Sequence, residues 1–138
     1  MSFSRILMTA GAAVLALAGL AASFLPDEIL RWSGTPAGPA PVLLVQVAGA
    51  LYLGFAALDW MSRHTLIGGI YGRPVLTANL LHFLCAALAC GKLVAGTPAA
   101  RFLWPVALVY AVFAAGFGAL MFRDPLPAST LAPAPAST

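Results

Sequence analysis

The stretch from Asp59 to His82 reads DWMSRHTLIGGIYGRPVLTANLLH and separates two long apolar segments of the chain. Charged, polar and glycine residues gather here, although the chain as a whole is 62% hydrophobic and only 8% charged. An ordinary soluble domain has about a quarter charged residues. A chain of 138 residues cannot hide this much apolar surface in one water-facing core. The composition therefore predicts that lipid surrounds most of the protein.

Four apolar segments of the chain are each long enough to cross a bilayer as a helix. At about 1.5 Å per residue, about 20 residues cover a hydrocarbon core of about 30 Å. We expect spans at residues 6–25, 42–61, 74–92 and 102–122. Their continuous apolar runs lack the alternation of a β-barrel. The predicted fold is an all-α bundle of four transmembrane helices with short connectors, forming one domain over residues 1–124.

The segments outside these spans are predicted from their proline and glycine content. Residues 26–41 hold repeated helix breakers, so we expect a connector, with a short helix starting at Pro26 and its acidic neighbours Asp27 and Glu28. Residues 125–138 contain only Pro, Leu, Ala, Ser and Thr, which predicts a disordered tail. The first span has a rival interpretation as a cleaved signal peptide, with Ala16–Ala18 as the cleavage site. We favour a retained span because the apolar run continues to Leu25.

Asp59 and Arg63 stand four residues apart at the end of the second span, with the acid first. This order favours a local ion pair on a helix near the headgroup level, and we expect that pair. The alternative makes Asp59 a proton carrier, because carboxylates inside membranes are costly and usually functional. A transport role would then depend on Asp59.

The connector between the second and third spans combines glycines with basic side chains. One interpretation is a tight turn with an interfacial tyrosine. The other is a nest of backbone N–H groups that holds an anionic lipid headgroup or a phosphate-bearing ligand. No G-K-[ST] follows the glycines, so a nucleotide-binding P-loop is not predicted. The candidate binding residues are Arg63, His64, Gly68, Gly69, Tyr71, Gly72 and Arg73.

Polar residues within the spans form a second set of candidates. Asn79 and His82 share one helix face, since three residues correspond to 300°, and this face should point into the bundle. We expect them and Gln46 to hydrogen-bond neighbouring helices. A functional alternative makes His82 a haem ligand, a quinone hydrogen-bond donor or a proton relay. We predict no metal site and no cofactor, with haem or quinone as the alternatives.

The distribution of basic residues bears on partners and orientation. The net charge is +3, but the seven Lys and Arg residues are scattered between apolar runs and form no stripe for nucleic acid. With the amino terminus inside, the basic residues on that side are Arg5, Arg63, Arg73 and Arg123, against Arg31, Lys92 and Arg101. This bias favours cytoplasmic termini. The abundance of Ala, Gly and Pro fits a bacterial membrane protein, and we expect it to lie in the inner membrane.

Three classes of function fit this sequence. The first is an accessory subunit or homo-oligomer that acts through helix packing and has no catalysis of its own, because small residues recur along the spans. The second is a small dimeric transporter or channel. The chain is similar in size and span number to small multidrug transporters and DoxX-like proteins, but residues 6–25 lack the acid that those transporters use. The third is a redox or lipid-binding protein that uses the Asn79 and His82 face and the connector at residues 68–73.

Overall fold

The computed structural model describes residues 3–64 and 72–122, and every regular element in these two ranges is a helix. Four of the helices are long and apolar enough to cross a membrane, which confirms the predicted all-α bundle of four transmembrane helices. The predicted tail at residues 125–138 lies outside the described residues. The elements are α1 (Phe3–Phe24), α2 (Pro26–Ser33), α3 (Pro39–Ser62), α4 (Gly72–Gly96), the 3-10 helix η1 (Pro98–Leu103) and α5 (Trp104–Met121).

α3 and α4 extend at both ends beyond the apolar runs from which they were predicted. α3 begins at Pro39 and contains Pro41, because the N–H groups of a first helical turn have no intrahelical acceptor and proline loses nothing there. α4 continues through Gly91 and Lys92 to Gly96, although glycine is a poor helix former in water. Inside a bilayer the helix is the only way to satisfy these backbone groups.

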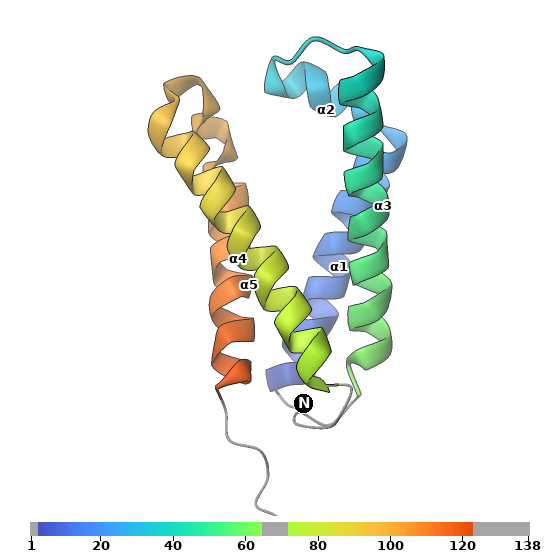
Figure 1. Ribbon diagram of the computed structural model, residues 1–138, viewed down its shortest axis with the longest axis vertical. Coiled ribbons are helices and arrows are strands. Elements are labelled where there is room, and N and C mark those ends of the chain that lie inside the picture. Colours follow the sequence, from blue (N-terminus) through green and yellow to red (C-terminus); the bar gives the residue numbers. More distant parts are fainter. Residues whose placement is uncertain (1–2, 65–71, 123–138) are drawn as a thin grey trace, which may run out of the picture.

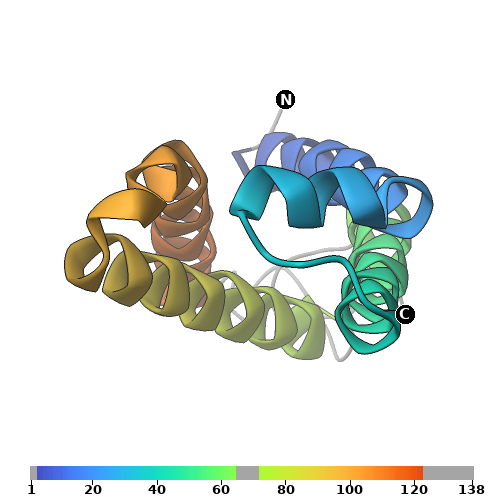
Figure 2. The ribbon, with the colours of Figure 1, turned by 90° about the horizontal axis from the view of Figure 1, so that it is seen from above.

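The short helix α2 follows directly after α1 and lies across the end of the α1 and α3 helices (Figure 2). Asp27 and Glu28 occupy its first turn, where negative charge interacts favourably with the helix dipole. Gly34 ends it at a φ of 72°, a left-handed conformation that glycine adopts without steric cost. Trp32 is 87% exposed, as expected for an aromatic side chain at the membrane interface.

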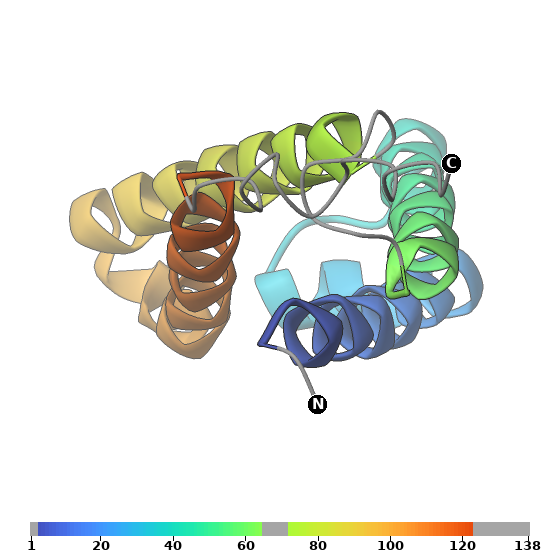
Figure 3. The same cartoon turned by 90° about the horizontal axis from the view of Figure 1, so that it is seen from below.

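The long helices pack as two antiparallel pairs, which we call the first hairpin (α1 and α3) and the second hairpin (α4 and α5). Each pair packs along its length (Figure 1). The two hairpins contact each other mainly at the end that holds the start of α1, and they diverge toward the end that holds α2 and η1. Seen from the amino-terminal end, the first turns of α4 lie beside α3 (Figure 3).

Small residues allow the two helices of the first hairpin to approach closely. A Cβ atom added to Gly19 would lie 2.9 Å from the carbonyl oxygen of Gly49, and one added to Gly49 would lie 2.6 Å from Ser23 Oγ. Gly19 and Ser23 belong to a row of small residues along the first span, which consists of Ala12, Ala16, Gly19 and Ser23. This row is therefore used to pack α1 against α3 within the chain.

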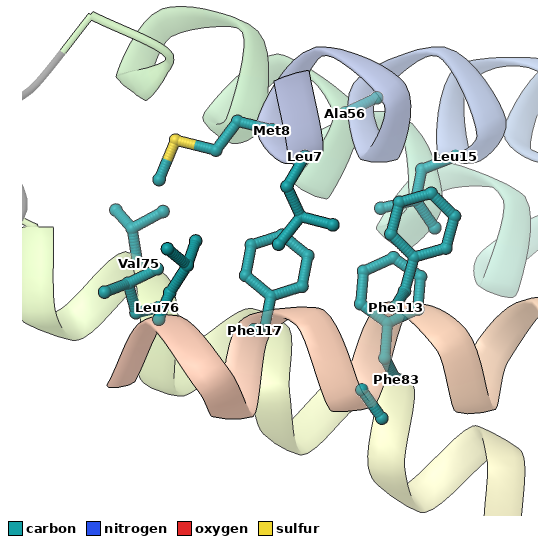
Figure 4. Packing of buried hydrophobic residues seen from close by; sticks show 11 residues of the cluster. Leu7, Met8, Leu15, Ala56, Val75, Leu76, Phe83, Phe113 and Phe117 are labelled. Carbon is teal, nitrogen blue, oxygen red and sulfur yellow. The ribbon is translucent and has the colours of Figure 1, made fainter. Parts of the chain in front are cut away.

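The apolar core lies where the two hairpins meet (Figure 4). Leu7 of α1 points toward Phe117 of α5. Phe83 of α4 stacks on Phe113 and Phe117, with ring centroids 4.8 and 5.5 Å apart. Elsewhere the long helices expose large apolar side chains that lipid can cover, among them Leu17, Leu44, Leu88 and Val112.

Candidate functional site

Asp59 and Asn79 form a polar pair between the hairpins, close to the amino-terminal end. Asn79 Nδ2 donates a hydrogen bond of 2.5 Å to Asp59 Oδ1 and another of 3.1 Å to the carbonyl oxygen of Val75. Both polar side chains are 0% exposed. The pair joins α3 of the first hairpin to α4 of the second. Asn79 therefore points into the bundle, as its place on the helix face predicts.

The expected ion pair between Asp59 and Arg63 is not formed among the described residues. Asp59 faces α4, whereas Arg63 follows the last turn of α3 and donates a hydrogen bond to the carbonyl oxygen of Trp60. Its guanidinium also lies 3.7 Å from the centroid of a Trp60 ring. The last carbonyls of a helix have no intrahelical donor, so Arg63 satisfies one of them instead of the carboxylate.

His82 lies one turn further along α4, inside an aromatic cluster that we define as Tyr52, Phe55, His82, Phe83 and Tyr110. The imidazole stacks on Phe55, with centroids 4.8 Å apart and an angle of 27° between the rings. Tyr52, Phe83 and Tyr110 contact it edge-on, at 5.4, 5.2 and 6.0 Å. His82 Nε2 is buried and has no hydrogen-bond partner in the described part of the chain.

Two tyrosines of this cluster form a second polar link between the hairpins. The hydroxyl of Tyr110 on α5 donates a hydrogen bond of 3.0 Å to the hydroxyl of Tyr52 on α3. Neither tyrosine was among the candidate residues expected from the sequence. A signal was present, since YLGFAA at residues 52–57 and YAVFAA at residues 110–115 both begin with these residues. Tyr52 also precedes Asp59 by seven residues, which places both on the same face of α3.

Apolar grooves run along the described part of the bundle, and two of them bear on its function. One, of about 300 Å³, lies between α1 and α5 and is lined by Val14, Ala18, Pro105, Val106, Val109 and Tyr110. The other, of about 470 Å³, lies between α1 and α3 and is lined by Thr9, Ala12, Ala13, Ala16, Leu53, Ala56, Ala57 and Trp60. The first groove reaches the aromatic cluster, because Tyr110 belongs to both.

The connector candidates are only partly described. Gly68, Gly69 and Tyr71 lie outside the described residues. Gly72 is buried at the start of α4, while Arg73 and His64 are exposed at this end of the bundle. Anionic lipid binding by this connector stays a prediction.

Gln46 lies on an exposed face of α3 and makes no hydrogen bond to a neighbouring helix among residues 3–64 and 72–122. The expected bond is therefore absent from this part of the structure, because the side chain points away from the other helices. Cys85 and Cys90 are both free, and their positions on different sides of α4 agree with their five-residue spacing.

Within the described ranges, no three His, Cys, Asp or Glu side chains come together as a metal site would require. Comparisons with protein families, with curated proteins and with solved structures give no match to this chain. The chain is a small multi-pass membrane protein. Because the comparisons suggest no function, we infer one from the polar and aromatic side chains inside the bundle.

Proposed function

We propose that this protein binds an amphipathic lipid with a flat, carbonyl-bearing headgroup, of the isoprenoid quinone class, and catalyses no reaction of its own. The observation that carries this proposal is that Tyr110 lines the α1 and α5 groove and also belongs to the aromatic cluster. An apolar channel that ends at a few convergent polar groups is typical of sites for small hydrophobic ligands.

The α1 and α5 groove supports the tail of such a ligand. Val14 and Ala18 form one wall, and Val106 and Val109 form the other, so an alkyl or isoprenoid chain would contact only apolar atoms there. None of the residues that line this groove is charged. A neutral headgroup therefore fits better than a phosphate or a carboxylate, which would need a cationic partner in the membrane.

The aromatic cluster supports the headgroup. A tyrosine hydroxyl offers one donor and two acceptor positions, so the Tyr52 and Tyr110 pair keeps unused hydrogen-bonding capacity. His82 adds a buried ring nitrogen that the described residues leave without a partner. The faces of these rings favour a planar ligand through offset or edge-on stacking.

A binding experiment tests this function with a short-chain ubiquinone analogue and the full chain in nanodiscs. Quenching of tryptophan fluorescence reports binding, since Trp104 directly precedes the groove residue Pro105. We expect Tyr110→Phe to weaken binding about tenfold, because one hydrogen bond of about 1.4 kcal/mol is lost. Val109→Phe should block the groove and abolish specific binding.

The matched control is Val112→Phe, which makes the same change on the same helix at an exposed position outside the groove. It should bind the analogue like the wild type. Equal quenching of the wild type, Val109→Phe and Val112→Phe would mean that the analogue only partitions into the lipid, and the proposed site would be abandoned.

A second candidate function, as an oligomer or accessory subunit, is favoured by the outer face of α3. Ala50, Gly54 and Ala57 are exposed there at small-residue spacing, and nothing lies within 4 Å of a Cβ added to Gly54. We expect Gly54→Leu to convert an oligomer into monomers in native mass spectrometry from mild detergent. Gly91→Leu is the control, since Gly91 is equally open but lies on α4. A wild type that is monomeric, or an oligomer that survives Gly54→Leu, would contradict this function.

We also infer an orientation with both termini in the cytoplasm of a bacterial cell, with the chain in its inner membrane. Arg5, Arg63 and Arg73 lie at the end where α1 begins and α3 ends. Both described acids outside the bundle, Asp27 and Glu28, lie at the opposite end. Arg31, Lys92 and Arg101 lie toward that opposite end too, so the excess of basic residues on the side of the amino terminus depends on counting Arg123 from the sequence, and this count supports the cytoplasmic orientation.

A further inference from the structure

The hydrogen bonds of the Asp59 and Asn79 pair leave two acceptors unused. The Asn79 amide nitrogen has two hydrogens, and its contacts to Asp59 and to the carbonyl oxygen of Val75 use both. Asp59 Oδ2 and Asn79 Oδ1 are buried and receive no hydrogen bond within the described residues. Each such unsatisfied polar atom costs about 1–3 kcal/mol, so a native protein normally supplies a partner. Both of these oxygens are acceptors, so the partner that each of them lacks is a hydrogen-bond donor.

The surroundings of Asp59 Oδ2 narrow the identity of this donor. A Cβ added to Gly11 of α1 would lie 3.0 Å from this oxygen, so the backbone of α1 closes the site on that side. The same added atom would meet Phe113 and Phe117 of α5 at 3.7 and 3.8 Å. Gly11 and the two phenylalanine rings near it therefore lie on one side of Asp59, Asn79 lies on another, and the residue is 0% exposed.

No basic side chain neutralises Asp59 in the described structure. The titratable or basic groups on the elements around it are Arg5 on α1, Tyr52, Arg63 and His64 on and after α3, Arg73, His82, Cys85, Cys90 and Lys92 on α4, and Tyr110 on α5. Arg63 is engaged by Trp60, and the ion pair found among the described residues, Arg31 with Glu28, lies at the opposite end of the bundle. An unpaired carboxylate at this position would be strongly disfavoured.

We propose that Asp59 is a proton-binding site, which holds a proton on Oδ2 at neutral pH and links proton binding to the contact between the hairpins. Addition of the proton converts the carboxylate into a neutral carboxyl group with one O–H donor, and no other bond changes. Release returns the proton to water and leaves a negative charge between α3 and α4. This inference does not depend on lipid binding by the protein.

Proton release has a structural consequence because few polar links hold the hairpins together. The side-chain hydrogen bonds that cross between them in the described residues are Asp59 with Asn79 and Tyr52 with Tyr110. A carboxylate would recruit water into the first of these contacts. Tyr52 lies two turns from Asp59 on the same face of α3. If α3 moves away from α4 at Asp59, the hydrogen bond between Tyr52 and Tyr110 would therefore weaken as well.

Infrared difference spectroscopy of the full chain in nanodiscs tests the proton directly. The wild type at neutral pH should show the carbonyl stretching band of an undissociated carboxyl group, and this band should shift in heavy water. Asp59→Asn should lack the band, whereas Asp27→Asn should keep it, because Asp27 is exposed on α2. A wild type that shows carboxylate bands alone would overturn the proposal.

Thermal unfolding provides the second measurement and also shows whether the variant folds. Asn is a neutral isostere of the protonated acid, so Asp59→Asn should unfold near the wild-type temperature at acidic pH, where the folded and the unfolded wild type both hold the proton. As the pH rises above the range in which the unfolded chain also holds this proton, the wild type should lose stability by up to about tenfold in its folding equilibrium per pH unit, and the loss should level off once the folded state releases the proton too. Asp59→Asn should lack this loss. Stabilisation of the wild type by sodium or potassium, absent in Asp59→Asn, would instead assign the site to a cation and overturn the proposal.

Discussion

Replacement of Gly49 by alanine is expected to lower the free energy of unfolding by about 2 kcal/mol, because overpacking at a helix contact forces backbone shifts. The added Cβ would lie 2.6 Å from Ser23 Oγ, 2.8 Å from Ser23 N and 2.9 Å from the carbonyl oxygen of Gly19. Two of these three atoms belong to the backbone of α1, so they cannot rotate away. Reversible unfolding in mixed detergent micelles measures the effect.

Gly91→Ala is the matched control for this substitution. Gly91 also lies within a long helix, and nothing lies within 4 Å of an added Cβ. Alanine is the better helix former by about 1 kcal/mol, so the control should be neutral or slightly stabilised. If both variants lose the same stability, the close approach of α1 and α3 does not determine the effect, and the packing described for the first hairpin is incorrect.

Truncation of Phe83 to alanine is expected to cost about 3 kcal/mol. The ring is 0% exposed and contacts Phe113, Phe117, Tyr110 and His82. Loss of a buried phenylalanine leaves a cavity that its neighbours fill only in part. We expect the lower end of the usual range, because lipid rather than water surrounds the separated helices and the loss is mainly one of packing. The same unfolding assay measures it.

Phe24→Ala controls for the loss of aromatic surface as such. Phe24 ends α1 and is 75% exposed, so its ring faces the surroundings of the bundle in the folded state. Its removal should change the free energy of unfolding by less than about 0.5 kcal/mol. A loss as large as that of Phe83→Ala would show that the rings contribute through the membrane rather than through the core.

The sequence is sufficient to predict the helical bundle and the inward direction of Asn79, because both depend on periodicity. Apolar runs of about 20 residues define membrane helices regardless of their neighbours. The helix face shared by Asn79 and His82 is likewise a property of one helix. Neither prediction requires knowledge of which helices are in contact.

The partner of Asp59 could not be predicted in this way. Its spacing to Arg63 is local and visible in the sequence, whereas Asn79 reaches it only because α4 crosses close to the end of α3. The link between Tyr52 and Tyr110 joins residues 58 positions apart for the same reason. Contacts between hairpins depend on the angle at which they meet, and a single sequence does not encode that angle in a readable pattern.

The division into two hairpins also bears on how the protein is made. Each hairpin consists of helices that follow one another in the chain, and most of the close packing lies within a hairpin. α1 therefore meets its partner α3 as soon as that helix enters the bilayer, while α4 and α5 are still to be synthesised. We therefore expect the helices to assemble in the order of translation, with the buried carboxyl group of Asp59 reaching its amide partner only after α4 is made.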